Sequence, residues 1–185
     1  PERVTIHQGD ALNFDFSVLG LQLRVVGNLP YNISTPLLFH LAGSGASIRD
    51  IHVMLQKEVV ARMVARPSSS AYGRLSVMLQ YRFQMEKILD VPAIAFRPAP
   101  KVESAVVRIL PLERPPGEAC DEALLANLVA SAFAQRRKTL RNTLRNYLGG
   151  ADFAMLGVAP EARAQELAVA DFMRVANYVA RKRAA

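Results

Sequence analysis

Cysteine and tryptophan are almost missing from this chain, which has one cysteine, Cys120, and no tryptophan among 185 residues. A single cysteine excludes a disulfide framework and a thiolate metal cluster, and it favours a reducing cytoplasm as the compartment. The three histidines, His7, His40 and His52, lie in strand or helix patterns without neighbouring ligands, so no metal site is predicted. The sequence also lacks a nucleophile elbow, a phosphate-binding loop and a zinc-deaminase signature.

Long apolar runs and a secretory signal are also missing, so we expect no membrane span. Acidic residues are scarce: 16 Asp and Glu stand against 23 Lys and Arg, which leaves a net charge of +7. That balance favours a polyanionic partner, nucleic acid first and an anionic membrane surface second. The 51% hydrophobic and 21% charged content is typical of a globular protein. Because the chain opens on Pro1 without a Met, we expect it to be part of a longer protein.

The first part of the chain follows an α/β pattern. Short β-branched or apolar runs alternate with helical segments, which is typical of buried parallel strands. Ser34-Thr35-Pro36 predicts a helix start with a capping hydroxyl, followed by a helix over 37–42 that Gly43-Ser44-Gly45 ends. Two late strands around a short proline-rich loop predict an antiparallel hairpin at the edge of the sheet. We expect strands at 4–7, 23–27, 51–56, 85–91 and 102–110, and further helices at 57–66 and 74–83.

Strand signals end after a proline-rich stretch, Pro111 to Gly117. Residues 124–148 then predict a long helix or a broken pair that Gly149-Gly150 closes. Pro160 predicts the start of a short helix, and 171–183 predicts a last one with Phe172, Val175, Ala176 and Val179 facing inward. We therefore expect an α/β domain over 1–112 and a small all-helical domain over 113–185.

The segment NLPYNIS, residues 28–34, follows an apolar strand and precedes a helix start. Asn28 offers a side-chain carbonyl, and Pro30 holds Leu29 in an extended conformation that directs the Leu29 carbonyl. Tyr31 offers a flat face on which a nucleobase stacks, worth roughly 1–3 kcal/mol. Two acceptors that bind both hydrogens of one exocyclic amine would turn the nitrogen lone pair towards an electrophile. The alternative is a proline turn in which Asn28 is only a turn former.

Two further segments offer groups that suit a ligand site. Gly9-Asp10 follows an expected strand, where a carboxylate can accept from a ribose hydroxyl or a base amine; capping the next turn is the equally open alternative. Phe96 precedes Pro98 and Pro100, which stiffen its loop. It is a candidate second stacking plate opposite Tyr31, and the alternative is a core phenylalanine that covers the sheet edge.

The segment QRRKTLRNTLR, residues 135–145, is strongly basic, and no acidic residue occurs between Phe133 and Gly150. On a helix of about 100° per residue, apolar residues form one stripe and cations gather beside it within an arc of about 60°. We favour phosphate binding over a merely solvated helix face, since a solvated face usually mixes charges of both signs. The stripe is Phe133, Leu140, Leu144 and Tyr147, the gathered cations are Lys138, Arg141 and Arg145, and Arg136 and Arg137 flank the stripe.

These segments together resemble a known family, the small-subunit ribosomal RNA adenine dimethyltransferases. The resemblance runs from about Val4 to Tyr178 and rests on an ordered set of motifs, of which NLPY alone is shared with other amino-methyltransferases. It implies the C-terminal part of a Rossmann-like, S-adenosylmethionine-dependent methyltransferase sheet followed by a helical RNA-binding domain. The motifs are NLPYNIS, LQKEVVARM at 55–63, YGRLSV at 72–77, FRPAPKVESAVV at 96–107 and FAQRRKTLRN at 133–142.

The resemblance implies transfer of two methyl groups from S-adenosylmethionine to each of two adjacent adenines near the 3′ end of small-subunit rRNA. It implies that Asp10, with Ala11 and Asn28, contacts the cofactor. Asn28, Leu29 and Pro30 would hold the target amine, and Tyr31 and Phe96 would stack on the flipped adenine. We expect the small ribosomal subunit precursor as partner, a monomer and no metal. RNA binding is assigned to Lys57, Arg74, Lys101, Arg136, Arg137, Lys138, Arg141 and Arg145.

One departure from the family pattern concerns the cofactor. The glycine-rich loop and the acidic residue that grips the ribose precede the part of the fold seen here, so we expect the 185 residues alone to bind S-adenosylmethionine weakly and to methylate little. Two alternatives to the main function stay open at this point. One is a large-subunit rRNA adenine methyltransferase, which shares the NLPY region, and the other is a non-catalytic RNA-binding factor in ribosome assembly.

Overall fold

The computed structural model describes residues 4–30, 32–114, 116–117 and 121–184. The chain divides into two compact units, each built from two stretches of sequence. The first unit comprises Pro1–Lys57 and Glu86–Pro111, and the second comprises Glu58–Met85 and Leu112–Ala185. Residues 58–85 therefore belong with the C-terminal stretch. The division into a methyltransferase domain over 1–112 and an RNA-binding domain over 113–185 stays a prediction.

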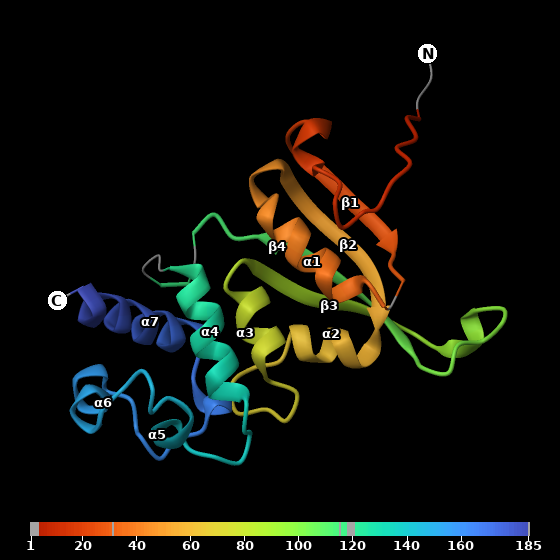
Figure 1. Cartoon of the computed structure of the whole chain (residues 1–185). Helices are drawn as coiled ribbons and strands as arrows, with labels where there is room; N and C mark the ends of the chain where they lie inside the picture. The colour runs from red at the N-terminus through yellow and green to blue at the C-terminus, as the bar shows by residue number, and fades with distance from the viewer. Residues whose placement is uncertain (1–3, 31, 115, 118–120, 185) are drawn as a thin grey trace. The chain divides into compact units, whose positions relative to one another are not determined.

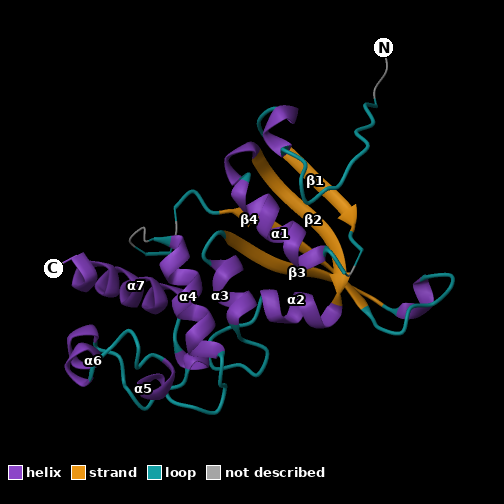
Figure 2. Cartoon of the chain, viewed as in Figure 1, coloured by secondary structure: helices purple, strands orange, loops and turns teal. Residues whose placement is uncertain are grey.

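A four-stranded sheet in the order β1-β2-β4-β3 is the framework of the first unit (Figure 2). β1 (Leu23–Asn28) and β2 (Ile48–Gln56) run parallel, with Val25 opposite Ile51, whereas β2 and β4 (Ser104–Pro111) run antiparallel, with Val53 opposite Val107. β3 (Phe83–Val91) lies beside β4 at the edge. Alternate residues of β2 and β4 are buried because successive side chains of a strand point to opposite faces. The strands expected at 23–27, 51–56, 85–91 and 102–110 are thus confirmed.

The strand expected at 4–7 is wrong, because 4–8 form no regular structure. The exposed fractions of Val4 and Ile6 are 73% and 87%, so these side chains gain nothing from burial. A strand needs a neighbour that satisfies its backbone groups, and β1 pairs with β2 alone among the described strands. The β-branched composition of the segment therefore does not suffice to form a strand.

Helix α1 (Ser34–Gly43) follows the NLPYNIS segment and lies over the strands in the view of Figure 1. It buries Leu37, Leu38 and Leu41, and it ends at the expected glycine. The expected hydroxyl cap is wrong: the cap position is Ile33, which makes no side-chain capping hydrogen bond. Pro36 lies in the first turn, where a missing backbone N–H costs nothing. Short 3₁₀-helices, η1 (Phe16–Leu19), η2 (Gly45–Ser47) and η3 (Ala93–Ala95), complete the first unit.

The second unit is helical around one apolar core. The two helices expected near its start are present but shorter, ending at Met63 and Gln80. The expected last helix is confirmed: its four inward residues, from Phe172 to Val179, are buried. Its elements are α2 (Lys57–Met63), α3 (Arg74–Gln80), α4 (Glu122–Phe133), α5 (Leu140–Thr143), α6 (Gly150–Leu156), η4 (Ala164–Glu166) and α7 (Val169–Ala184).

Of the two alternatives predicted for 124–148, the broken pair is found, and the single helix on which residues 135–145 were placed is wrong. α4 ends at Phe133, residues 134–139 form a turn, and α5 has only four residues. The cause is tertiary, because the backbone N–H groups of Leu140 and Arg141 donate to Ala162 O at 2.8 Å and Pro160 O at 3.0 Å instead of to carbonyls four residues earlier. Leu140 and Leu144 are nevertheless fully buried, so the expected apolar stripe faces the core without lying on one helix.

Two further expectations about the helical unit are wrong. Gly149-Gly150 does not close a helix but starts α6, because the Asp152 carboxylate accepts from the Gly149 N–H at 2.6 Å at the helix N-terminus. Pro160 lies in a turn, and the short helix after it is the 3₁₀-helix η4. No helix in the described residues combines the length and apolar character that are needed to cross a lipid bilayer.

Candidate functional site

Asn28 lies at the C-terminal end of β1, where open α/β sheets hold their ligands. Its side chain is exposed and has no hydrogen-bond partner among the described residues. The ladder continues one residue further, since Leu29 N donates to Met54 O at 3.3 Å, and Pro30 then begins a turn in which Ile33 N donates to Pro30 O at 3.2 Å. The backbone of residues 28–30 is therefore anchored on one side by β2 and on the other by the turn into α1. Tyr31, the expected stacking residue, lies outside the described residues.

Phe96 follows η3 in the loop between β3 and β4. Its backbone N–H donates to Ala93 O at 3.2 Å, and its side chain is half-buried, so part of the ring is open to a ligand. The expected pairing of this ring with Tyr31 stays a prediction. In the same loop Lys101 is exposed.

Lys57, expected to contact RNA, is engaged by two carboxylates of the first unit. Its ammonium donates to Glu103 at 2.7 Å and lies 4.0 Å from Asp90. The hydrogen bond to Glu103 and the charges of both carboxylates raise the pKa of Lys57 above its ordinary value. The backbone N–H of Lys57 also donates to Glu103 O at 2.9 Å. Lys57 therefore ties the end of β2 to the segment before β4, and its charge is already balanced.

Asp10 closes a turn. Its two carboxylate oxygens accept from Leu12 N at 2.9 Å and from Asn13 Nδ2 at 3.0 Å, while its carbonyl accepts from Asn13 N at 3.0 Å. This is the capping role that the sequence left open, and it fixes the carboxylate next to Ala11. An ionised carboxylate offers about four lone-pair positions, so this one retains acceptor capacity.

A hollow of about 250 Å³, here called the Ala11 hollow, lies beside that turn. Phe14 and Phe16 line it, and a row of edge-to-face or tilted ring contacts joins His7, Phe14, Phe16 and His40. His40 also holds Phe14 in place, with 2.7 Å between its Nε2 and the Phe14 carbonyl oxygen. Phe14 and Phe16 were not predicted as site residues, although two aromatic residues two positions apart after Asp10 are a signal in the sequence.

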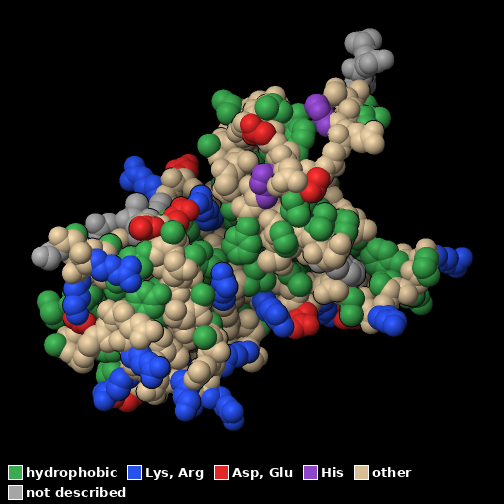
Figure 3. Space-filling model, in the orientation of Figure 1, with side chains coloured by type: hydrophobic (Ala, Val, Ile, Leu, Met, Phe, Trp, Pro, Cys, Tyr) green, Lys and Arg blue, Asp and Glu red, His purple; other side chains and the backbone are tan. Residues whose placement is uncertain are grey.

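The cations of the second unit differ in how they are engaged. Arg136 donates to Ser70 O at 2.7 Å, and Arg141 pairs with Glu161 at 2.7 Å. The remaining cations of the basic segment are exposed, and their side chains make no hydrogen bond or ion pair with the described residues. They are Arg137, Lys138 and Arg145. Lys and Arg side chains gather over the turn between α4 and α5 and over α5 (Figure 3).

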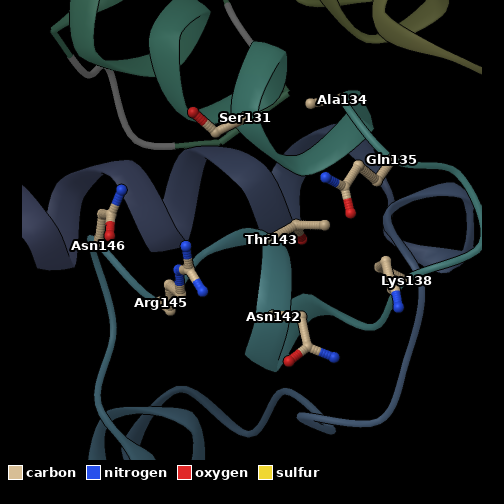
Figure 4. Close-up of a pocket in the computed structure, with 8 residues that line it drawn as sticks. All are labelled: Ser131, Ala134, Gln135, Lys138, Asn142, Thr143, Arg145 and Asn146. Carbon is tan, nitrogen blue, oxygen red and sulfur yellow. The ribbon is translucent and has the colours of Figure 1, made fainter.

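Two hollows lie among these cations. The Arg74 hollow, of about 310 Å³, has Arg62, Arg74 and Arg136 in its lining together with Phe133 and Tyr72. The Tyr72 ring is buried, which raises the pKa of its hydroxyl to about 12. The second, the Lys138 hollow, of about 430 Å³, is lined mostly by polar side chains, which include Lys138 and Arg145 (Figure 4). Of the cations expected to bind RNA, Arg74 and Arg136 thus line one hollow, and Lys138 and Arg145 line the other.

Metal ligands do not converge in the described part of the chain, where no group of three or more His, Cys, Asp or Glu side chains is placed to hold an ion. The exposed amide of Asn28, the aromatic residues of the first unit and the cations of the second are the groups with chemistry to offer. Such a set suits the binding of flat, amine-bearing rings and of phosphates.

Comparison with known proteins identifies the family. A family model described as ribosomal RNA adenine dimethylase matches residues 1–181. A ribosomal RNA small subunit methyltransferase A from Aromatoleum aromaticum is 64% identical over 182 residues, which cover 98% of this chain and 69% of that protein. The crystal structure of a dimethyladenosine transferase from Plasmodium falciparum superposes with a TM-score of 0.78 at 25% identity, covering 95% of this chain and 72% of that one.

The crystal structure of the 23S rRNA methyltransferase ErmE superposes with a TM-score of 0.67 at 20% identity, over 92% of this chain and 70% of that one, and shows a shared fold. The α/β part is accordingly a piece of the S-adenosylmethionine-dependent methyltransferase fold, as the sequence predicted. With a matching family model over almost its whole length and a relative of 64% identity, the chain belongs to the ribosomal RNA adenine dimethylase family.

Proposed function

We propose that this chain is the target-base part of an enzyme that transfers methyl groups from S-adenosylmethionine to the exocyclic amines of two adjacent adenines near the 3′ end of small-subunit rRNA. The observation that carries the proposal is an exposed Asn28 at the C-terminal end of β1 in a member of this family. The name of the 64% identical relative supports the small subunit as substrate. We propose the small ribosomal subunit precursor as partner, the cytoplasm as compartment and a monomer as the acting form.

The proposed chemistry needs only acceptors at the target amine. Asn28 Oδ1 and the Leu29 carbonyl each accept one hydrogen of the amine, which leaves the nitrogen lone pair pointing outward. As the lone pair forms the new N–C bond, positive charge develops on the nitrogen, and both oxygens stabilise it. This is oxyanion-hole stabilisation with the sign reversed. S-adenosylmethionine, held at Asp10 and Ala11, would supply the methyl group. The electrons of the broken C–S bond would stay on sulfur, and the methylated nitrogen would lose its proton to solvent.

The first unit offers a place for the adenine end of the cofactor. The Ala11 hollow is small and aromatic, which suits a flat ring. The fixed Asp10 carboxylate beside it retains capacity to accept from the adenine amine. We propose that Asp10 and Ala11 hold this end, with Asn28 between cofactor and target.

The target adenine must leave its stack, which costs a few kcal/mol. We propose that Tyr31 and Phe96 offset this cost by stacking on the extruded base. The half-buried Phe96 ring supports this assignment, because a core residue would be covered fully. RNA backbone binding is proposed for Arg74, Lys101 and the cations of the second unit; Lys57 takes part only indirectly, since Glu103 and Asp90 engage it.

Asn28→Ala tests the assignment. We expect methylation to fall by at least about 10²-fold, because one of two acceptors for the developing charge is lost, while binding to the small subunit stays nearly unchanged. The full-length protein, expressed from its gene in a host that lacks its own enzyme of this family, is assayed by mass mapping of methylated adenines in both rRNAs. Sedimentation with small subunits measures binding.

Asn127→Ala is the matched control, since Asn127 is an exposed asparagine on α4, remote in sequence from the NLPY segment. It should leave methylation intact. Equal losses of methylation and of subunit binding in the Asn28 variant would favour a non-catalytic assembly factor. Methylated adenines in the large-subunit rRNA alone would point to the alternative substrate.

The 185-residue chain by itself is expected to bind S-adenosylmethionine weakly. The described residues near the proposed cofactor position offer one turn carboxylate and a hollow of about 250 Å³. That volume lies below the roughly 300–1,000 Å³ of typical ligand sites. Isothermal calorimetry with this chain should give a dissociation constant weaker than about 100 μM. Micromolar binding would contradict the expectation.

A further inference from the structure

The Lys138 hollow combines cations with carboxamides, and a surface that binds phosphates alone does not need the carboxamides. Figure 4 shows its lining residues coming from the end of α4, from the turn after it and from α5 with the residues that follow. In that view Thr143 lies between Gln135 and Lys138 on one side and Arg145 and Asn146 on the other. The hollow has a volume of about 430 Å³, within the range of sites that take one small-molecule-sized group.

Uncompensated positive charge is its first property. Lys138 and Arg145 are exposed and have no acidic partner among the described residues, and no Asp or Glu occurs between Phe133 and Gly150. The neighbouring Arg141 shows the contrast, because Glu161 neutralises it at 2.7 Å. Two cations at one hollow without a carboxylate favour an anion with oxygen acceptors, and a guanidinium binds phosphate in a bidentate manner.

Three carboxamides are its second property. Gln135 and Asn146 make no side-chain hydrogen bond within the described part of the chain, and Asn142 uses only its Nδ2, which donates to Thr139 Oγ1 at 3.1 Å. Each carboxamide offers donors and an acceptor side by side. A phosphate has no hydrogens to give, so it would leave the three carbonyl oxygens without partners. A ligand edge that alternates donors and acceptors would use both halves, and nucleobase edges have this pattern.

We propose that the Lys138 hollow binds one unpaired nucleotide of RNA, with the phosphate on Lys138 and Arg145 and the base edge on Gln135, Asn142 and Asn146. The proposal rests on the proposed function, because it takes RNA as the ligand. It adds that this surface distinguishes bases, whereas phosphate contacts alone would only position the RNA. Unpaired bases are the form in which RNA exposes these edges to proteins.

Binding of four fluorescent single-stranded RNA hexamers, all-A, all-C, all-G and all-U, tests the proposal. Fluorescence anisotropy between 50 and 200 mM salt is measured on the unchanged chain and on two double variants. We expect the unchanged chain to prefer one hexamer by at least about fivefold, the lower range for one well-formed pair of base-edge contacts. The Asn142→Ala/Asn146→Ala variant should bind all four within about twofold, with its salt dependence unchanged.

The Lys138→Gln/Arg145→Gln variant should weaken all four hexamers alike and lower the salt slope by about 1.4, since each lost phosphate contact on a single strand contributes about 0.7. Arg137→Gln is the matched control. It removes an exposed cation of the same turn that does not line the hollow, so it should retain the base preference. All four substituted residues of the hollow are exposed, and circular dichroism melting verifies that the variants fold.

Equal binding of the four hexamers by the unchanged chain would overturn the proposal. So would a carboxamide variant that loses affinity uniformly for all four hexamers together with salt slope. The proposed function fails separately: a base preference without methylation of small-subunit rRNA would contradict the enzyme and leave the nucleotide site standing.

Discussion

The two units of this chain differ in how completely they bury their apolar side chains. In the second unit, Leu125, Leu144, Phe153 and Phe172 are nearly or fully buried, and Met155 is the one large apolar side chain that is exposed among the described residues. In the first unit several stay open, and the exposed fraction of Val26 is 78%. Val26 lies two residues before Asn28, on the same face of β1. The second unit therefore exposes little apolar surface. The first unit exposes apolar side chains, and one of them, Val26, lies beside the Asn28 amide that we assign to base binding.

Phe172→Ala should produce the largest loss of stability. Phe172 is fully buried in the core of the second unit, where it contacts Phe133 at a ring distance of 5.8 Å. Removing a buried aromatic ring costs about 3–5 kcal/mol of unfolding free energy. Ile94→Ala in the first unit, where the side chain is 87% exposed, should change it by less than about 0.5 kcal/mol. Urea unfolding followed by circular dichroism measures both, and similar losses would contradict the comparison.

Asp152 accepts a set of hydrogen bonds that makes the stability of the second unit depend on pH. Its carboxylate accepts from Lys182 Nζ, from Tyr178 OH and from Gly149 N, each at 2.6 Å, and so joins the start of α6 to the C-terminal half of α7. The hydrogen bond from Lys182, followed by those from Tyr178 and Gly149, lowers the pKa of Asp152 from 3.8 to about 2. Because the folded pKa is depressed, the stabilisation is fully present above about pH 4 and is lost as pH falls from there towards 2.

Asp152→Asn tests the contribution of these hydrogen bonds. At pH 7 we expect its thermal midpoint to fall by on the order of 5 °C, since hydrogen bonds to a charged acceptor are weakened. Between pH 4 and pH 2 the midpoint of the unchanged chain should fall more steeply than that of the variant. The difference between the two curves isolates Asp152 from other carboxylates, such as Asp50, whose pKa the hydrogen bond from Arg24 lowers. Parallel curves would contradict the role of Asp152.

The sequence predicted those elements whose cause is local. The strand at 23–27 and the last helix carry their apolar period in the residues themselves, and both are found. A break within 124–148 was one of two predicted alternatives, but its position after Phe133 was not predictable, because no Gly or Pro marks it and the hydrogen bonds of Leu140 and Arg141 to residues 160–162 set it. The prediction of a strand at 4–7 was wrong for the opposite reason: its composition is strand-like, but no described strand lies beside it to pair with.

The candidate site was predictable to a similar extent. Asn28 could be placed because a strand end and a proline fix it locally, and the structure leaves its side chain exposed. Asp10 was left between two roles, and its hydrogen bonds to Leu12 and Asn13 show the turn role. The pairing of Lys57 with Glu103 joins residues 46 positions apart, and no spacing in the sequence signals it.

Glu161→Gln should have the smallest effect and sharpens the distinction between paired and unpaired cations. The variant releases Arg141, which is now paired at 2.7 Å on an exposed surface. Surface pairs are worth about 0–1 kcal/mol, so the unfolding free energy should change by no more than that. RNA affinity at 50 mM salt should rise about two- to threefold, and the gain should shrink at 200 mM as screening increases. Glu86→Gln makes the same charge change at an exposed position of the first unit and should not raise affinity. An equal gain in both variants would mean that RNA responds to net charge alone, and Arg141 would then have no specific place in the RNA-binding surface.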